Sequence, residues 1–264
     1  VLSMCFLTFF NGKKPVLFPD ITYSFYSVWA DLYRIPYEKQ KLDDNMKIVP
    51  EDYYKENGGV IFPNPNAPTG LLMDLDSVRD IIEHNKDVVV IVDEAYIDFG
   101  GVSAKDLVNE YDNVLVVQTF SKSRSMAGMR IGYAFGSKEL IKALNDVKFS
   151  FNSYTMNMTS IDMGVASIND KKYFEECVER ITATRERTKE ELTKLGFTFP
   201  DSKANFIFAT HKSVPAKEIF EKLKDLNIFV RYFAQPGIDN YLRITIGTDE
   251  QMDKLISALS EIVG

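Results

Sequence analysis

The sequence predicts an α/β fold with a mostly parallel sheet, followed by a smaller α+β unit. The first half alternates short apolar runs with helical patterns, as βαβ units do. Asn, Pro and Gly bound these runs, as expected for strands. From about residue 154 the pattern changes to a long charged helix and then a mixture of strands and helices. We therefore predict a large domain over residues 1–160 and a small C-terminal domain over residues 161–264.

The elements of the large domain follow from local patterns. Apolar residues at positions 2, 5, 6, 9 and 10 share one helical face and predict an N-terminal helix. Apolar runs bounded by turn residues predict the strands, and amphipathic segments between them predict the helices. The expected strands are 16–18, 33–36, 60–62, 88–92, 114–117 and 131–134, and the expected helices are 24–31, 75–85, 102–109 and 138–148.

The small domain begins with a helix over residues 171–195. Its Glu, Arg and Lys residues recur at i, i+4 spacing, and Gly196 marks its end. The segments that follow predict strands at 205–208, 228–231 and 241–246 and helices at 216–226 and 249–262.

Composition excludes several classes of function. With 264 residues, 45% of them hydrophobic, the chain can bury one large core or a large and a small one. A net charge of −7 argues against nucleic acid and anionic membranes as partners. Two isolated cysteines and two histidines in no motif predict no metal site and no disulfide, and hence a cytoplasmic protein. The apolar opening of ten residues is about half a membrane span.

Polar side chains follow two of the predicted strands. Thr119, Ser121 and Lys122 come just after strand 114–117, with Arg130 eight positions beyond Lys122, while strand 88–92 ends in Asp93-Glu94-Ala95-Tyr96. In an open α/β sheet, ligands bind at the carboxyl edge of the strands. An amine, two hydroxyls and a guanidinium suit a cofactor that carries both a phosphate and a carbonyl group.

Four patterns occur in a fixed order along the chain. They are Asn-Pro-Asn-Ala-Pro-Thr-Gly at 64–70, Asp-Glu-Ala-Tyr at 93–96, Thr-Phe-Ser-Lys at 119–122 with Arg130, and Tyr-Leu-Arg-Ile-Thr at 241–245. Together they resemble the fold-type I aminotransferases, which use pyridoxal 5'-phosphate, and within that group the histidinol-phosphate aminotransferase family. The resemblance runs from residue 15 to residue 248. It implies a fold-type I architecture, with a large domain of mostly parallel sheet flanked by helices and a small α+β domain.

The resemblance implies a role for each residue near the cofactor ring. Lys122 is the expected catalytic residue, because its amine condenses with the cofactor aldehyde and later shuttles a proton at the substrate α-carbon. Asp93 faces the pyridine nitrogen and keeps it protonated. Tyr96 donates a hydrogen bond to the ring oxygen, and Tyr23 stacks on the ring.

Further residues are implied for the cofactor phosphate and the substrate. Thr119, Ser121 and Arg130 clamp the phosphate, for which the planar fork of arginine is well suited. Arg243 binds the substrate α-carboxylate or its equivalent, and Arg231 grips a substrate phosphate. Each residue alone also has a structural interpretation, such as a solvated lysine, a half-buried tyrosine, a turn-capping serine or an arginine in a salt bridge.

The Asn-Pro segment departs from the family pattern. Members commonly carry Asn directly before Pro-Thr-Gly, whereas this chain has Ala67 there and Asn66 one position earlier. Either Asn66 binds the cofactor through a small backbone shift, or the contact is absent. Relatives also carry an N-terminal arm and a glycine-rich turn, so we expect this chain to lack an N-terminal segment.

The resemblance implies transfer of an amino group from histidinol phosphate to 2-oxoglutarate, giving imidazole-acetol phosphate and glutamate, by a homodimer. Alternatives on the same scaffold are a threonine-phosphate decarboxylase, an aromatic aminotransferase or a truncated inactive remnant. An apolar strand that ends in Asp-Glu also occurs in P-loop ATPases. That class requires the motif G-x-x-x-x-G-K-[ST], which does not occur in the chain.

Overall fold

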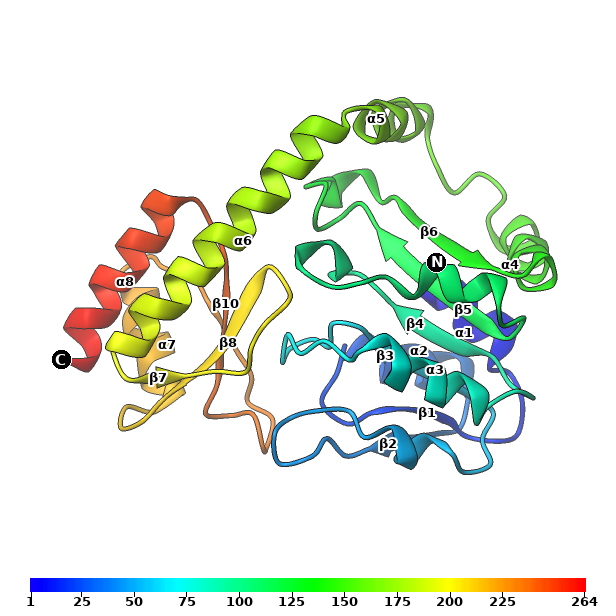
Figure 1. Cartoon of the computed structure of the whole chain (residues 1–264), viewed down its shortest axis with the longest axis horizontal. Coiled ribbons are helices and arrows are strands. Elements are labelled where there is room, and N and C mark those ends of the chain that lie inside the picture. Colours follow the sequence, from blue (N-terminus) through cyan, green and yellow to red (C-terminus); the bar gives the residue numbers. More distant parts are fainter.

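A six-stranded and a four-stranded sheet organise the chain (Figure 1), and the computed structural model describes residues 1–264. The larger sheet has the order β2-β1-β3-β4-β5-β6. Its pairs are parallel except β5 with β6, which is antiparallel. The prediction of a mostly parallel sheet is therefore confirmed. The strands are β1 (Val16–Pro19), β2 (Tyr37–Gln40), β3 (Gly59–Pro63), β4 (Val90–Asp93), β5 (Val114–Thr119) and β6 (Gly132–Gly136).

Helices cover both faces of this sheet. On one face α1 (Leu2–Phe9), α2 (Phe25–Tyr33) and α4 (Lys138–Phe151) pack on one set of strand residues, which includes Ile61, Ile91 and Leu115. On the other face α3 (Leu75–Glu83) and two 3₁₀ helices, η1 (Pro50–Tyr53) and η3 (Ala104–Asn109), pack on the alternate set. Strands that are buried on both faces read as continuous apolar runs, which explains why the sequence identified them.

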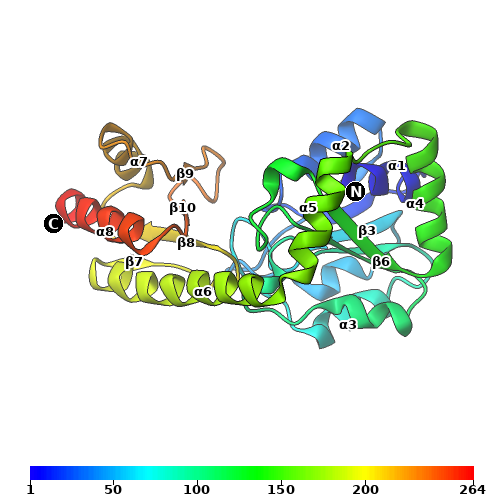
Figure 2. The same ribbon diagram turned by 90° about the horizontal axis from the view of Figure 1, so that it is seen from above.

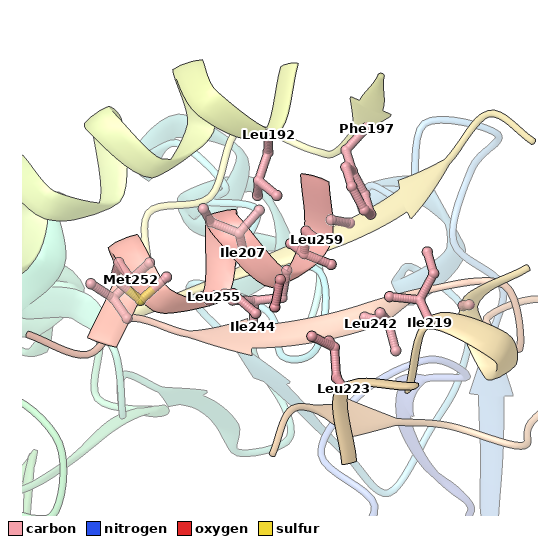
Figure 3. Packing of buried hydrophobic residues seen from close by; sticks show 14 residues of the cluster. Leu192, Phe197, Ile207, Ile219, Leu223, Leu242, Ile244, Met252, Leu255 and Leu259 are labelled. Atoms are coloured by element: carbon pink, nitrogen blue, oxygen red, sulfur yellow. The ribbon is translucent and has the colours of Figure 1, made fainter. Parts of the chain in front are cut away.

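The four-stranded sheet has the order β7-β8-β10-β9 and carries its helices on one face. Side chains of β8 and β10 alternate between its two faces. Ile207, Leu242 and Ile244 pack with helix residues in one core cluster (Figure 3), whereas Phe206 and Arg243 lie on the opposite face. The elements are β7 (Phe197–Thr198), β8 (Phe206–His211), α7 (Ala216–Asp225), β9 (Arg231–Tyr232), β10 (Leu242–Thr245) and α8 (Asp249–Val263).

Two consecutive helices connect the sheets. α5 (Met158–Asn169) lies beside the large sheet, and α6 (Lys171–Lys194) runs from there to the small one (Figures 1 and 2). Arg185 of α6 is buried, and its Nη1 donates to the carbonyl oxygens of Phe99 and Ala204, each at 2.8 Å. The Lys203 N–H donates to the Gly70 carbonyl oxygen at 2.8 Å. These bonds fix the units against each other, while a boundary at residue 160 stays a prediction.

Several element predictions were wrong. The strand expected at 33–36 lies at Tyr37–Gln40, because α2 extends through Tyr33 and ends at Arg34 with a left-handed φ of 57°. The segment at 104–109 is 3₁₀ rather than α-helical. Helix α5 was not predicted, because its apolar side chains are largely exposed and form no one-sided pattern. None of the helices combines the length and apolar character of a membrane span.

Gly70 tests how closely the two units pack. Its φ is +77°, and an added Cβ would lie 2.4 Å from the Ser202 hydroxyl oxygen. We expect Gly70→Ala to lower the free energy of unfolding by about 2–4 kcal/mol, from backbone strain and overpacking together. Gly237, at φ +87° with open space around it, is the matched control that carries the backbone strain alone. Equal losses in urea unfolding of the two variants would contradict the predicted collision.

Candidate active site

A cavity of about 440 Å³ lies at the carboxyl edge of β4 and β5. The pairing of these parallel strands sets Asp93 beside Val117, so that the segments following both strands open into one space. The start of α1 and the segment before β6 complete the wall. Most of the predicted site residues line this cavity, namely Tyr23, Asp93, Tyr96, Thr119, Ser121, Lys122 and Arg130.

Asp93 is the buried charge of the site. Its Oδ2 accepts a hydrogen bond from the Tyr26 hydroxyl at 2.7 Å, and its Oδ1 accepts the Ala95 N–H at 3.3 Å. Burial raises the pKa of Asp93 to about 6, against the opposing effects of the two hydrogen bonds and of the Lys122 charge. The neighbouring Glu94 has its own donors from Ser103, Ala104 and Gln118, so its carboxylate is held within the fold.

The amine of Lys122 lies against an aromatic ring. Its Nζ is 5.2 Å from the centroid of the Tyr96 ring, a cation–π arrangement. Tyr96 also contacts the small sheet, where the Phe206 ring packs edge-to-face with a centroid distance of 5.1 Å. Tyr23 also lines the cavity, and its ring centroid lies 5.9 Å from that of Trp29, another lining residue.

Hydroxyl and guanidinium groups gather where β5 ends. The Thr119 hydroxyl lies 2.9 Å from that of Ser121 and accepts the Ser121 N–H at 3.1 Å. Arg130 adopts a left-handed backbone with φ 56°, and its Nη1 donates to the Ala127 carbonyl oxygen at 2.7 Å. The remaining donors of Arg130 and the two hydroxyls can bind an anion such as a phosphate.

The structure does not bring Asn66 to the cavity wall. Its amide donates to the Ile21 carbonyl oxygen at 3.0 Å and to the Thr69 hydroxyl at 3.3 Å, and its oxygen accepts from Thr22 at 3.1 Å. Both the nitrogen and the oxygen of the side-chain amide are therefore engaged in hydrogen bonds within the fold. Ala67 lines the cavity in its place, so the expected cofactor contact of Asn66 has no geometric basis in this structure.

The two predicted substrate arginines lie outside the cavity wall, on the small sheet. Arg243 lies over Phe206, with its guanidinium carbon 5.2 Å from the ring centroid. Its Nε is buried and has no hydrogen-bond partner. Arg231 is exposed and lies over Phe233 at 5.5 Å. Phe206 thus touches both Arg243 and Tyr96, so Arg243 lies one aromatic ring away from the wall that holds Lys122.

Sequence reasoning missed two residues of the site. Tyr26 donates a hydrogen bond to Asp93 without lining the cavity itself, and Trp29 lines the cavity. Both lie on α2, three and six positions after Tyr23. Helical spacing places such residues on neighbouring parts of one surface and could have indicated them.

A second cavity, of about 550 Å³, lies between residues 123–129 and helices α5 and α6. Its cation, Arg124, donates to the Ser167 carbonyl oxygen at 2.6 Å and stacks over Phe174 at 4.2 Å. None of the predicted site residues lines this space. The smaller cavity is therefore the candidate active site.

The comparisons with known proteins show the family of the chain. The model of the family "Aminotransferase class I and II" matches residues 1–259. A histidinol-phosphate aminotransferase from Clostridium beijerinckii is 53% identical over 263 residues, which are 100% of this chain and 74% of that protein. A second, from Lactococcus lactis subsp. cremoris, is 50% identical over 99% of this chain and 73% of its own length. The chain belongs to aminotransferase class I and II, a family of pyridoxal-phosphate-dependent enzymes.

Solved structures show the same fold. The histidinol-phosphate aminotransferase from Clostridium acetobutylicum superposes with a TM-score of 0.90 at 24% identity, over 98% of this chain and 81% of that one. The one from Sinorhizobium meliloti, in complex with pyridoxal 5'-phosphate, gives 0.90 at 21% identity over 99% and 74%. The L-threonine-O-3-phosphate decarboxylase from Porphyromonas gingivalis gives 0.81 at 19% identity over 98% and 80%. The fold-type I architecture is therefore confirmed, and it is shared by enzymes with different reactions.

The raised pKa of Asp93 predicts a pH-dependent stability. The folded chain favours the protonated carboxyl group, so the free energy of unfolding falls as pH rises from about 4 through about 6. Asp93→Asn removes this loss. Without cofactor, we expect the free energy of unfolding of the variant, relative to that of the unaltered chain, to rise by about 3 kcal/mol from pH 4 to pH 7. Urea unfolding across that range measures the gain, with the exposed Asp239→Asn as control. A constant difference between Asp93→Asn and the unaltered chain would contradict this.

Proposed function

We propose that the chain binds pyridoxal 5'-phosphate in the 440 Å³ cavity and transfers an amino group between histidinol phosphate and 2-oxoglutarate. Family membership establishes the class of enzyme, and relatives about half identical to the chain bear this activity in their names. The observation that carries the proposal is that one wall brings together Lys122, the buried Asp93 and the anion-binding group of Thr119, Ser121 and Arg130.

The donor set fits the cofactor. Thr119, Ser121 and Arg130 would hold its phosphate, and Asp93 would hold the proton of its pyridine nitrogen. When bound, the cofactor supplies an electron-withdrawing ring that stabilises negative charge at the substrate α-carbon. Lys122 would remove the proton from that carbon and return a proton during the reaction.

Arg243 supports the binding of an anionic substrate. A buried guanidinium nitrogen without a partner is costly, and a substrate carboxylate or phosphate would satisfy it. Arg231 is exposed on the neighbouring strand and would bind a substrate phosphate at the rim. Since a threonine-phosphate decarboxylase shares the fold, the choice of reaction rests on the relatives' identity and not on the architecture.

We also infer that two copies of the chain associate and that the enzyme works in the cytoplasm. Apolar side chains are exposed at the end of α4, in the connection to α5 and on α5 itself, where a second copy would cover them. They include Phe151, Tyr154, Met158, Ile161 and Ile168. A mass of one chain in light scattering would contradict the homodimer.

Lys122→Ala tests the cofactor assignment. Pyridoxal phosphate added to the unaltered chain should give the visible absorbance band of the cofactor joined to a lysine amine. The variant should lack the band and all transaminase activity, because no other lysine lines the cavity. The control is Lys138→Ala, at an exposed position at the start of α4. A band that persists in Lys122→Ala would contradict the assignment of Lys122 as the lysine that joins the cofactor.

Turnover with different substrates tests the reaction. We expect transamination of histidinol phosphate and no release of carbon dioxide from threonine phosphate. Arg243→Gln should lower kcat/KM for glutamate by about 100-fold, the effect of losing a charge-assisted hydrogen bond. Arg231→Gln should raise KM for histidinol phosphate and leave that for glutamate nearly unchanged. No activity on histidinol phosphate, or decarboxylation of threonine phosphate, would overturn the proposed substrate.

A further inference from the structure

We propose that Tyr26 is a positioning residue that holds the Asp93 carboxylate ionised and in place for the protonated ring nitrogen of the cofactor. The inference deepens the proposed function and rests on it. Tyr26 does not line the cavity, so it cannot touch a ligand there. Any effect of Tyr26 on a ligand in the cavity must therefore pass through Asp93.

The geometry fixes the pair. The Tyr26 hydroxyl donates to Asp93 Oδ2 at 2.7 Å, and both side chains are buried, with exposed fractions of 0% and 5%. Three rings pack around that of Tyr26, with centroids at 6.0 Å for Phe6, 5.8 Å for Phe18 and 5.7 Å for Tyr23. They come from α1, β1 and the segment before α2, so the phenol has little freedom to turn away from Asp93.

The charge balance around Asp93 shows why this donor matters. Burial raises the pKa of Asp93, and the groups that lower it include the Tyr26 hydroxyl, the Ala95 N–H and the charge of Lys122. Two further titratable groups face the carboxylate. Burial raises the pKa of the Cys5 thiol to about 12 and raises that of Tyr23, so both stay neutral at working pH.

The phenol can act as a donor throughout the working pH range. Burial and the nearby Asp93 carboxylate raise the pKa of Tyr26 well above its ordinary value, so the O–H is retained. Phenylalanine at this position would keep the ring packing and remove only the donor. The Ala95 N–H and the charge of Lys122 would then stabilise the carboxylate without this donor, and a larger fraction of Asp93 would be protonated at neutral pH.

The first test needs no cofactor. The Asp93 side-chain carboxyl carbon is followed by NMR in ¹³C-labelled protein as pH is varied, with the signal assigned by its loss in Asp93→Asn. We expect Tyr26→Phe to move the titration midpoint upward by about one pH unit, the effect of one hydrogen bond to a charged group. An unchanged midpoint would overturn the proposal. This outcome does not depend on whether the chain is an aminotransferase.

The second test measures a ligand. Pyridoxamine 5'-phosphate keeps the ring and phosphate but cannot condense with Lys122, and Trp29, the only tryptophan of the chain, lines the cavity and reports binding by fluorescence. We expect Tyr26→Phe to weaken binding by about fivefold near pH 6 and by less than twofold at pH 8.5, where Asp93 is ionised in both proteins. Equal weakening at every pH would indicate a packing role only and would overturn the proposal.

Controls separate the possible failures. Tyr53→Phe removes the hydroxyl of another buried tyrosine, which packs on the other face of the sheet and has no hydrogen bond to Asp93. The Asp93 titration midpoint and the pH dependence of ligand binding in this variant should therefore match those of the unaltered chain. Absence of ligand binding by the unaltered chain would contradict the proposed function, while the NMR midpoint still decides the role of Tyr26. If Tyr26→Phe is unfolded at pH 8, the double variant Tyr26→Phe/Asp93→Asn should be folded, because it has no buried carboxylate that lacks its donor. A double variant that is also unfolded would contradict the proposed link between the Tyr26 hydroxyl and the Asp93 carboxylate.

Discussion

The parallel pairing of β3, β4 and β5 is the constraint on which the site depends. In this register Pro63, Asp93 and Val117 lie in a row across three strands. The chain leaves each strand at the same edge, so segments distant in sequence open into one cavity. A slip of one residue would turn Asp93 from the α1–α2 face to the opposite face of the sheet. The close packing of each face against its own helices opposes such a slip, so that the packing of the sheet also determines the geometry of the site.

A buried carboxylate opposes that stability. Ionised Asp93 loses solvation, and the fold compensates with the Tyr26 hydroxyl, the Ala95 N–H and the charge of Lys122. The compensation is incomplete, because the pKa of Asp93 still lies above its ordinary value. A positively charged ring nitrogen would complete it. The desolvation cost that destabilises the protein without ligand therefore favours binding of a cationic heterocycle, because the bound cation would relieve that cost.

The sequence predicts what depends on local pattern and misses what depends on packing between distant segments. The buried strands and the residues that follow β4 and β5 could be predicted because apolar runs and sheet edges have simple rules. The position of Asn66 could not, since the choice between cavity and turn is made by contacts with Ile21 and Thr22, more than forty residues away. Tyr26 was missed for a similar reason, because it lies on α2 and its partner Asp93 lies on β4, 67 residues further along the chain.

The small unit contributes to the cavity through aromatic contacts. Strand alternation places Phe206 and Arg243 on the face of β8 and β10 that carries no helices. Phe206 packs on Tyr96, which in turn lies beneath the Lys122 amine. Because Arg185 holds α6 to the segment after Tyr96, the units cannot separate without breaking buried hydrogen bonds. A substrate anion bound to Arg243 would therefore sit at a distance from Lys122 that the packing of two rings sets, and the spacing between substrate anion and reacting carbon becomes a property of the interface between the two units.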